Sequence, residues 1–452
     1  MNETMQSIIT AAQDFVWGPV TLFLLVGTGV YLTFRLFFLQ IRFLPVALKW
    51  AFFPHRDAKN AEGDISHFAS LMTALSATIG TGNIAGVATA MVAGGPGALF
   101  WMWISAFFGM ATKYAEAILA VKYRVTNDKG EQAGGPMYYI ERGLKMRWLA
   151  VTFAVLAAVA SFGIGCSVQS NSVAQAVEAN FGVAPWVTGV FLTVLTGVVV
   201  IGGIRSISRV AELIVPVMAM VYVIGGLVVI MMQAELIGQA FELIFSQAFT
   251  AQSVTGAALG KIIQYGVARG VFSNEAGMGS APIAAAAAKT DHPARQAFVS
   301  MTGTFLDTIV VCTITGLVIT IGYIMAGGSY SGLNGAALTS AYFDKLFPGG
   351  GGFIVTFGLI FFAYSTILGW CYYGEKCVEY LFGSKMLLPY RLMYVLFVLL
   401  GTLAQLDLVW RLADIFNGLM AIPNLIGLLL LSNIVVKETK EFVVRRKEGQ
   451  YY

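Results

Sequence analysis

Eleven apolar stretches recur along the 452-residue chain, and each has the apolar length of a membrane-spanning helix. About 20 predominantly apolar residues cross a bilayer as an α-helix. Backbone groups cannot stay unpaired in lipid, so the alternative to membrane-spanning helices is a closed β-barrel. The strands of such a barrel would alternate in polarity over about ten residues. The chain instead shows continuous apolar runs at residues 16–34, 66–92, 97–120, 148–177, 186–203, 210–232, 259–288, 296–326, 353–380, 387–404 and 412–434. We therefore predict an all-α polytopic membrane protein with 11 transmembrane helices.

The composition supports this fold class and gives no sign of a structural metal. Hydrophobic residues make up 57% of the chain and charged residues 12%, against about 25% charged in a typical soluble domain. The four cysteines fall inside expected spans without the paired spacing of a metal site. We expect buried free thiols, no organic cofactor, no nucleic-acid partner and no obligate protein partner besides the lipid bilayer. The N-terminus lacks the basic segment of a cleaved signal peptide, so the first span is expected to remain.

The distribution of Lys and Arg predicts the orientation, because these residues concentrate in the cytoplasmic loops of membrane proteins. With the N-terminus outside, 22 of the 28 Lys and Arg residues fall in inner segments, whereas only Lys345 and Arg411 fall in outer ones. If the count were wrong by one span, the Lys and Arg residues would fall on both sides of the membrane. The pattern therefore predicts an outer N-terminus and a cytoplasmic C-terminus.

The spans after the first divide into two groups of five, and an odd number per group inverts the second group in the membrane. This predicts a five-plus-five inverted repeat with one extra N-terminal helix. The expected units are 1–60 (extra helix and basic inner loop), 61–235 (first repeat), 236–436 (second repeat) and 437–452 (charged cytoplasmic tail). We also expect an interfacial helix within residues 122–147, a flexible outer loop at 327–352 and a solvated tail.

Glycine-rich interruptions occur in the first span of each group. Residues 76–86 read S-A-T-I-G-T-G-N-I-A-G, and glycine costs about 1 kcal/mol relative to alanine inside a helix. Residues 272–279 read F-S-N-E-A-G-M-G. We expect broken helices near 77–83 and 271–279, although small residues also serve ordinary packing between membrane helices. Two interrupted spans in corresponding halves indicate the binding site of a transporter.

The chain carries four recognisable segments, two of which contain the interruptions described above. Residues 94–109 read G-G-P-G-A-L-F-W-M-W-I-S-A-F-F-G, and residues 270–282 read G-V-F-S-N-E-A-G-M-G-S-A-P. With A-T-I-G-T-G-N-I-A-G at 77–86 and Q-A-G-G-P-M-Y-Y-I at 132–140, they resemble the signatures of the alanine/glycine:cation symporter family, of the amino acid–polyamine–organocation superfamily. The resemblance implies uptake of alanine or glycine driven by Na⁺, or less often by H⁺, at the cell membrane of a prokaryote. It also implies the fold of the neurotransmitter:sodium symporters with one extra N-terminal helix.

The two ends of a broken helix suit the two charges of an amino acid. Exposed N–H groups at a helix N-terminus suit the carboxylate, here at Gly80–Gly82, and exposed carbonyls suit an ammonium group or Na⁺. Related folds place a substrate-contacting side chain on the fourth span, where Gln169 is our candidate, and Trp370 would form the floor of the pocket. The resemblance thus implies a substrate site formed by Thr78, Gly80, Thr81, Gly82, Asn83, Gly165, Gln169, Phe272, Ser273, Asn274 and Trp370.

In folds of this type, a hydroxyl pair on the ninth span completes a sodium site with the first broken helix. Ser365 and Thr366 occupy this position, and the carbonyls of Ser76 and Ile79 would face the same cation. Hydroxyl and carbonyl oxygens are hard ligands without a fixed charge, which suits reversible binding of Na⁺. The alternative is that both hydroxyls bond back to the preceding helical turn.

Ionisable residues inside the spans are candidates for coupling or gating. Asp307 would bind a coupling cation or relay a proton, and Arg269 and Glu275, which bracket the second break, would form a gate. Lys113 and Glu116 are spaced for an internal ion pair. The charges at the inner end of the ninth span are expected to be solvated, and they are Glu375, Lys376 and Glu379.

Two other function classes are less compatible with the sequence. A channel would need rings of polar residues in an oligomer, whereas this chain carries its expected repeat internally. A membrane enzyme would need a nucleophile with its base or a set of metal ligands. The three histidines, His55, His67 and His292, lie near the inner surface outside any such cluster. We therefore predict a secondary transporter, with proton coupling through Asp307 or Glu275 as the alternative to sodium coupling.

Overall fold

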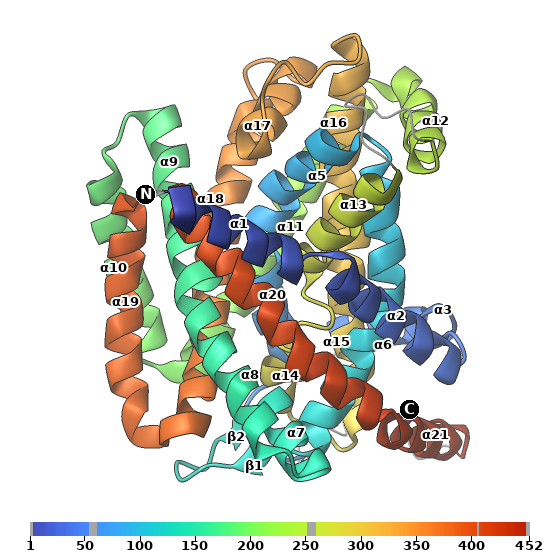
Figure 1. The fold of residues 1–452 in the computed structure, drawn as a ribbon, viewed down its shortest axis with the longest axis vertical. Helices are drawn as coiled ribbons and strands as arrows, with labels where there is room; N and C mark the ends of the chain where they lie inside the picture. The colour runs from blue at the N-terminus through green and yellow to red at the C-terminus, as the bar shows by residue number, and fades with distance from the viewer. Residues whose placement is uncertain (1–2, 54–60, 251–258, 405, 449–452) are drawn as a thin grey trace.

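Figure 1 shows the fold of a computed structural model, which describes residues 3–53, 61–250, 259–404 and 406–448. The end of the predicted first unit, 54–60, and the end of the predicted tail, 449–452, lie outside these ranges. Helices dominate the described part. Its sheet is a small antiparallel hairpin of β1 (Val125–Thr126) and β2 (Gln132–Ala133).

Helices of the first half of the chain follow the expected spans closely. They are α1 (Glu3–Val16), α2 (Pro19–Arg35), α3 (Leu39–Phe52), α4 (His67–Thr78), η2 (Gly82–Gly86), α5 (Val87–Gly94), α6 (Ala98–Lys122), α7 (Pro136–Leu144), α8 (Arg147–Ala160), η3 (Ser161–Ser167), α9 (Val168–Phe181), α10 (Pro185–Val200), α11 (Gly203–Met231), η4 (Ala234–Leu236) and α12 (Ile237–Ala248). The short helix α7 lies within the segment where we expected an interfacial helix. The helix α3 occupies part of the segment that we expected to be a basic loop.

Helices of the second half continue in the same manner. They are α13 (Leu259–Asn274), α14 (Ala281–Ala286), α15 (Pro293–Thr304), η5 (Phe305–Cys312), α16 (Thr313–Met325), α17 (Gly335–Leu346), α18 (Gly351–Phe382), η6 (Ser384–Met386), α19 (Leu387–Leu403), α20 (Leu406–Leu430) and α21 (Ser432–Lys447). The segments η2, η3 and η5 are π-helical, a local widening of the helix that is common at functional sites.

Among the described residues, eight helices are long and apolar enough to cross a membrane. The count becomes nine when α4 and the segment Gly82–Gly94, which are bent by 53° relative to each other, form one broken span. The helix α10 is apolar but shorter, and the pair α13 and α14 is interrupted. A helical membrane protein with several spans is therefore confirmed, whereas the count of 11 and the inverted repeat remain predictions.

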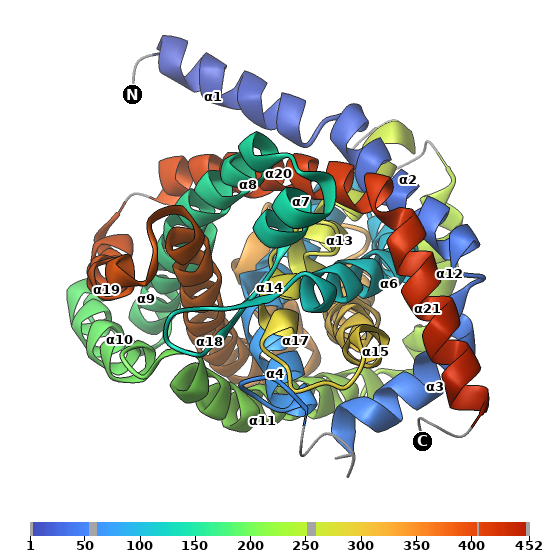
Figure 2. The same ribbon diagram turned by 90° about the horizontal axis from the view of Figure 1, so that it is seen from below.

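The broken spans lie near the middle of the bundle. In Figure 2, α4, α14 and α15 occupy the centre, with α9, α10, α18 and α19 on one side and α2, α3 and α21 on the other. The long helix α6 packs against both α13 and α15. The helix α1 lies along the outside of the bundle against α20. This arrangement surrounds both breaks with protein rather than lipid, which irregular backbone at membrane depth requires.

The expected flexible loop at 327–352 contains the ordered helix α17. This helix buries Leu338, Tyr342 and Phe343. The hydroxyl of Thr339 donates a hydrogen bond to the carbonyl of Ile84 over 2.9 Å, which joins α17 to the first broken span. The glycines on either side of α17 led us to expect a flexible loop. The apolar positions between these glycines nevertheless form a face that packs against the protein.

The predicted tail also differs from expectation, because its first part forms α21 and packs on the bundle. Lys122 Nζ lies 2.5 Å from Glu438 Oε1. The buried ring of Phe442 lies edge-on to Trp50 at 5.8 Å and within 5.9 Å of the Phe298 ring. A segment that is strongly charged overall thus still presents one apolar face to the protein.

We expect Phe442→Ala to lower the free energy of unfolding by about 3 kcal/mol, because truncating a buried aromatic leaves a cavity. Val444→Ala is the matched control, since Val444 is 54% exposed on the same helix. Chemical unfolding of the purified protein in detergent measures both variants. Equal stability of the two variants would show that α21 does not pack as described.

Candidate functional site

The first break separates α4 from η2 and leaves Ile79 in an extended conformation, with φ −74° and ψ 94°. Asn83 Oδ1 accepts a hydrogen bond of 2.9 Å from the Gly80 N–H. This N–H, which we expected to bind a carboxylate, is therefore already paired within the break. A Cβ at Gly80 would lie 2.6 Å from Thr366 Oγ1, so glycine is required for this close approach.

The four residues of the predicted sodium site come together at the end of α4. Ser365 Oγ donates to the Ser76 carbonyl over 3.2 Å, and Thr366 Oγ1 lies 3.4 Å from the Ile79 carbonyl. Both hydroxyls also bond back to the carbonyl of Phe362 over 2.9 Å. The back-bonding weighed as the alternative for this pair is therefore present, and the same hydroxyls also face the carbonyls of the first break. All four residues are buried.

The second break follows α13 and consists of residues 275–280, ahead of the short helix α14. Glu275, Gly277 and Gly279 have φ values of 55°, 88° and 87°, in the left-handed region. Glycine adopts this region without a steric penalty, which explains why the G-M-G pattern interrupts the span. The N–H of Glu275 still donates to the Val271 carbonyl over 2.7 Å, so this carbonyl is also paired.

Asp307 links the two breaks. Its Oδ1 accepts a hydrogen bond of 2.7 Å from Asn83 Nδ2, and its Oδ2 accepts bonds from Ser273 Oγ (2.9 Å) and Thr308 Oγ1 (2.8 Å). Asn274 Nδ2 in turn donates to Thr308 Oγ1 over 3.0 Å. A carboxylate in η5 thus gathers the polar side chains that we assigned to the substrate site from both broken spans.

Lys113 and Glu116 contact different partners, so the expected ion pair between them is wrong. Lys113 Nζ donates to the carbonyl of Asn274 over 2.8 Å, at the C-terminal end of α13. Glu116 Oε1 accepts from the Gly279 N–H over 3.0 Å and from Asn424 Nδ2 over 2.6 Å. The break leaves backbone carbonyls and N–H groups without helical partners. Lys113 and Glu116 form hydrogen bonds with these groups instead of with each other.

Asn424 is a residue of this region that the sequence analysis did not select. Its Nδ2 also donates to the Gly277 carbonyl over 2.8 Å, and its Oδ1 accepts a hydrogen bond from the Tyr139 hydroxyl. The side chain therefore ties the second break to α7 and α20. The signal available was an amide inside an apolar span, directly after Pro423.

Arg269 and Glu275 contact other groups in this structure, so the predicted gate between them stays a prediction. Glu275 is buried, with Oε1 accepting from Trp370 Nε1 (3.0 Å) and Oε2 from Ser280 Oγ (2.5 Å). The Arg269 guanidinium instead lies over the Phe272 ring, 5.4 Å from its centroid. Trp370 packs against Gly165, where an added Cβ would fall 2.2 Å from Trp370 Cβ.

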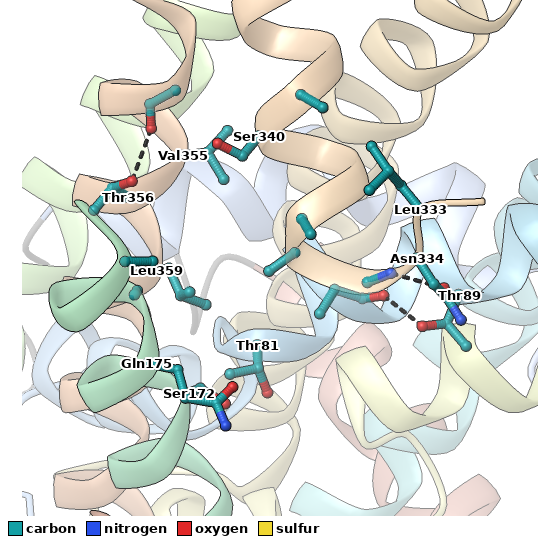
Figure 3. Close-up of a pocket in the computed structure, with 18 of the residues that line it drawn as sticks. Thr81, Thr89, Ser172, Gln175, Leu333, Asn334, Ser340, Val355, Thr356 and Leu359 are labelled. Carbon is teal, nitrogen blue, oxygen red and sulfur yellow. Dashed lines mark hydrogen bonds between the residues drawn. The ribbon is translucent and has the colours of Figure 1, made fainter. Parts of the chain in front are cut away.

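A cavity of about 1270 Å³ leads toward the first break from the end of the molecule that carries α5 and α17. Figure 3 shows Thr81 near its floor, with Ser172 and Gln175 of α9 on one side and α17 opposite. Arg269 and Phe272 are the other predicted residues on its wall. The Phe272 ring stacks on Trp410, with centroids 6.2 Å apart. We call this cavity the vestibule.

Gln169 lies beneath the vestibule with an unpaired oxygen. Its Nε2 donates to Thr81 Oγ1 over 3.3 Å and to the Ile164 carbonyl over 3.0 Å. Its Oε1 is buried and has no hydrogen-bond partner in the described part of the chain. The Oε1 atom is 3.5 Å from the position of a Cβ on Gly80. A buried acceptor without a donor is costly, so this oxygen is suited to a ligand that supplies one.

Thr78 and Gly82 have different surroundings. Thr78 Oγ1 bonds back to the carbonyl of Ala74 over 3.2 Å, a local arrangement that assigns it no ligand. Gly82 begins η2, and a Cβ there would lie 3.2 Å from Ser273 Cα, so the two broken spans touch at this point. The close contact explains a small residue at position 82 without reference to a ligand.

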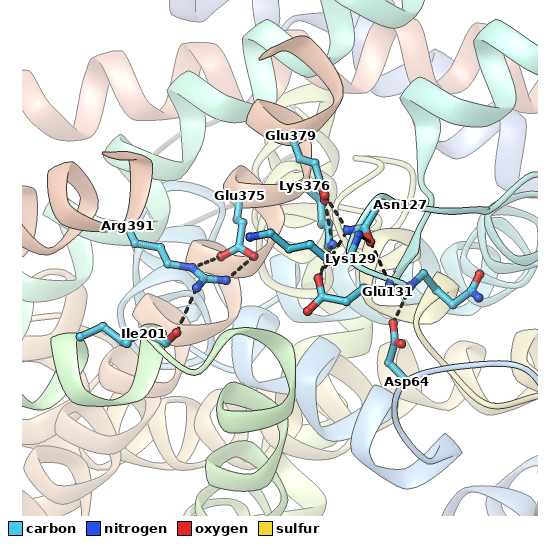
Figure 4. A network of polar contacts seen from close by, with 10 residues as sticks. Asp64, Asn127, Lys129, Glu131, Ile201, Glu375, Lys376, Glu379 and Arg391 are labelled. Atoms are coloured by element: carbon cyan, nitrogen blue, oxygen red, sulfur yellow. Dashed lines mark hydrogen bonds and ion pairs between the residues drawn. The ribbon is translucent and has the colours of Figure 1, made fainter. Parts of the chain in front are cut away.

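The charges at the end of α18 are buried and paired, so the expectation of solvated side chains is wrong. Figure 4 shows Arg391 bound to Glu375 through two hydrogen bonds of 2.7 Å. Lys376 Nζ lies 2.8 Å from Glu379 Oε2 and 3.5 Å from Glu131 Oε2. The β1–β2 hairpin covers these charges, which the helical spacing alone could not reveal.

Comparisons with known proteins agree along the whole chain. A model of the sodium:alanine symporter family matches residues 2–452. The sodium/alanine symporter AgcS of Methanococcus maripaludis is 61% identical over 449 residues, covering 98% of this chain and 99% of that protein. A probable sodium/glutamine symporter, GlnT of Bacillus subtilis, is 38% identical over 454 residues, covering 100% of this chain and 93% of that protein.

Solved structures show a related fold. The crystal structure of MhsT in complex with L-phenylalanine superposes with a TM-score of 0.53 at 14% identity, covering 84% of this chain and 98% of that chain. A Na⁺-coupled sialic acid symporter in a substrate-bound outward-open state gives a TM-score of 0.50 at 12% identity, covering 94% of this chain and 86% of that chain.

The family match extends over both broken spans and every residue of the candidate site. The identity to AgcS is far above the level at which common descent is in question, and the fold agrees with it. The chain therefore belongs to the sodium:alanine symporter family.

Proposed function

We propose that this protein is a secondary transporter that couples the movement of Na⁺ to the uptake of alanine, and of glycine as a smaller substrate. Family membership and the name of the 61% identical relative support sodium and alanine. The observation that carries the site is the unpaired Gln169 Oε1 beside the first break. Proton coupling is the less favoured alternative, since the family is defined by sodium.

The substrate site is proposed between the two breaks, at the base of the vestibule. Gln169 Oε1 would accept a hydrogen bond from the ammonium group of alanine. Backbone N–H groups at the start of η2 carry partial positive charge and would face the carboxylate, with Thr81 and Asn83 beside them. Phe272 and the backbone near Ser273 would close the side facing the second break.

Sodium is proposed to bind at the carbonyls of Ser76 and Ile79 with the hydroxyls of Ser365 and Thr366. Their oxygens already converge within hydrogen-bonding distance of one another. A cation would replace those hydrogen bonds with direct contacts to the same oxygens. Because α4 and α18 contribute two ligands each, bound Na⁺ would hold these two helices together.

Asp307 is proposed as the coupling group between the breaks. Its carboxylate contacts Asn83 of the first broken span and Ser273 of the second. A charge bound or released near this carboxylate would change contacts to both spans at once. Buried acidic residues inside membrane spans commonly serve ion or proton pathways.

The orientation is proposed from the basic residues, which place the vestibule on the outer side of a prokaryotic cell membrane and the β1–β2 hairpin in the cytoplasm. In this orientation the structure resembles a transporter open to the outside, with the buried ion pairs of Figure 4 closing the inner side. In each of the two proposed five-helix units, 61–235 and 236–436, the first predicted span is the broken one.

Radiolabelled alanine should accumulate in proteoliposomes when an inward Na⁺ gradient is imposed, since the gradient supplies the free energy for uptake. An inward H⁺ gradient of equal size, without Na⁺, is the matched comparison. Uptake driven by H⁺ alone would transfer the coupling role to Asp307 or Glu275. Absence of uptake under both gradients would remove support for alanine as the substrate.

Thr366→Val should raise the Na⁺ concentration that gives half-maximal alanine uptake, because it removes one oxygen ligand while keeping the side-chain shape. A lost ligand contact of about 1 kcal/mol corresponds to roughly fivefold. Thr366→Ser should restore the wild-type value. Thr320→Val is the control, as Thr320 Oγ1 bonds back to Gly316 over 2.7 Å on another helix. An unchanged Na⁺ dependence in Thr366→Val would contradict the proposed ligand.

Gln169→Leu should weaken alanine binding by about tenfold or more, because a hydrogen bond to a charged group contributes about 1.5–3 kcal/mol. Competition of unlabelled alanine for uptake measures the affinity. Gln175→Leu is a control on the same part of the chain, since Gln175 lines the vestibule and is not beside the break. Wild-type affinity in Gln169→Leu would place the substrate elsewhere.

A further inference from the structure

Backbone hydrogen bonds join the two broken spans at the end of the molecule opposite the vestibule. Ile65 and Ala288 form a parallel bridge, and the Lys289 N–H donates to the Ile65 carbonyl over 2.8 Å. Residues 62–65 lead into α4, and residues 287–290 directly follow α14. Segments that are far apart in the sequence are therefore paired where α4 begins and where α14 ends.

Gly63 permits the two segments to approach this closely. A Cβ at this position would lie 2.4 Å from the backbone N of Lys289 and 2.5 Å from the carbonyl oxygen of Ala288, and the φ angle of 148° is rare for other residues. Any side chain here would force the segments apart. The contact thus depends on the backbone itself and not on adjustable side chains.

Arg124, just beyond the end of α6, binds both segments. Its NH1 donates to the carbonyls of Ala288 (2.8 Å) and Ala286 (3.1 Å), and its NH2 donates to the carbonyl of Glu62 (2.8 Å). The rigid fork of a guanidinium can hold several acceptors at fixed separation, which a lysine ammonium on a flexible stem cannot do equally well. One side chain therefore connects the ends of three spans.

Contacts from this region to the surrounding helices are of a different kind. Ser66 Oγ donates to Glu212 Oε1 of α11 over 3.3 Å at the surface. Asn127 Nδ2 donates to Glu379 Oε1 of α18 over 2.6 Å, within the network of Figure 4. Side-chain contacts can break and re-form during a conformational change, whereas the backbone pairing of two segments has fewer alternatives.

We propose that Arg124 is a positioning residue of the transport cycle, which holds the ends of both broken spans together so that α4 and α14 move as one unit. The unit would move against α11 and α18, which are joined at this end of the molecule to Ser66 and to Asn127 of the hairpin through side chains. The proposal rests on the proposed transport function. It differs from a mechanism in which α4 swings away from α14 to open this side of the molecule.

Cross-linking tests whether the two segments stay together. The double variant Glu62→Cys/Lys289→Cys, treated with a short bifunctional methanethiosulfonate, should keep alanine uptake near that of the untreated protein in proteoliposomes. The four native cysteines are buried, so the reagent addresses the introduced pair. Uptake by the untreated double variant is the baseline, so a failure of alanine transport itself would be seen before any cross-link is made.

Ser66→Cys/Glu212→Cys is the matched pair, because it joins the same end of α4 to α11 with the same reagent. We expect this cross-link to abolish most uptake. Loss of uptake with both pairs would overturn the proposal, since α4 and α14 would then have to separate. Uptake that survives both cross-links would overturn it equally, because the unit would not move against α11.

Arg124→Gln should reduce uptake several-fold and leave Na⁺-dependent alanine binding by the detergent-purified protein unchanged. The Glu62–Lys289 cross-link should restore uptake in this background, because it replaces the connection that Arg124 supplies. A misfolded variant would lose binding, and no cross-link would restore it. Arg124→Gln that transports normally, or that the cross-link does not rescue, would show that Arg124 does not act by joining the two segments.

Discussion

The need to pair backbone groups at two helix breaks governs the centre of this structure. Each break frees N–H and carbonyl groups in a region without bulk water, where an unpaired group costs several kcal/mol by rough estimate. Asn83 pairs the Gly80 N–H, Lys113 pairs the Asn274 carbonyl, and Glu116 pairs the Gly279 N–H. Burying a charge without a partner costs free energy, and here the buried charges instead stabilise the irregular backbone.

The same pairing connects the two broken spans at several depths. Near the vestibule, Gly82 packs against Ser273. In the middle, Asp307 accepts hydrogen bonds from both spans. At the far end, residues 62–65 pair with 287–290. A ligand that changed the contacts at one break would therefore also change contacts at the other. Such shared contacts are the physical basis on which the binding of two ligands can be coupled.

The helix breaks and the convergence of Ser365 and Thr366 on the first break could be anticipated from the sequence. Closely spaced glycines inside an apolar run indicate a helix break. A pair of hydroxyl side chains in another apolar span can contact only a few polar groups, and the break supplies such groups. The burial and the partners of the individual charged side chains could not be anticipated. Lys376 and Glu379 share a helix with spacing that suits solvent, yet both are buried, and residues of the β1–β2 hairpin segment pair with them. Likewise, Asn424 becomes important only because α20 passes beside the second break.

By itself, the sequence determined that this chain is a helical membrane protein with interrupted spans near residues 80 and 276, because hydrophobic length and glycine placement act locally along the chain. The tertiary structure decided which groups those interruptions face. Arg124 meets the carbonyls of Glu62 and Ala288, which are 62 and 164 positions away in the sequence, and Glu275 meets Trp370 rather than Arg269. Such pairings depend on distances between helices, which are fixed only when side chains from several spans pack together.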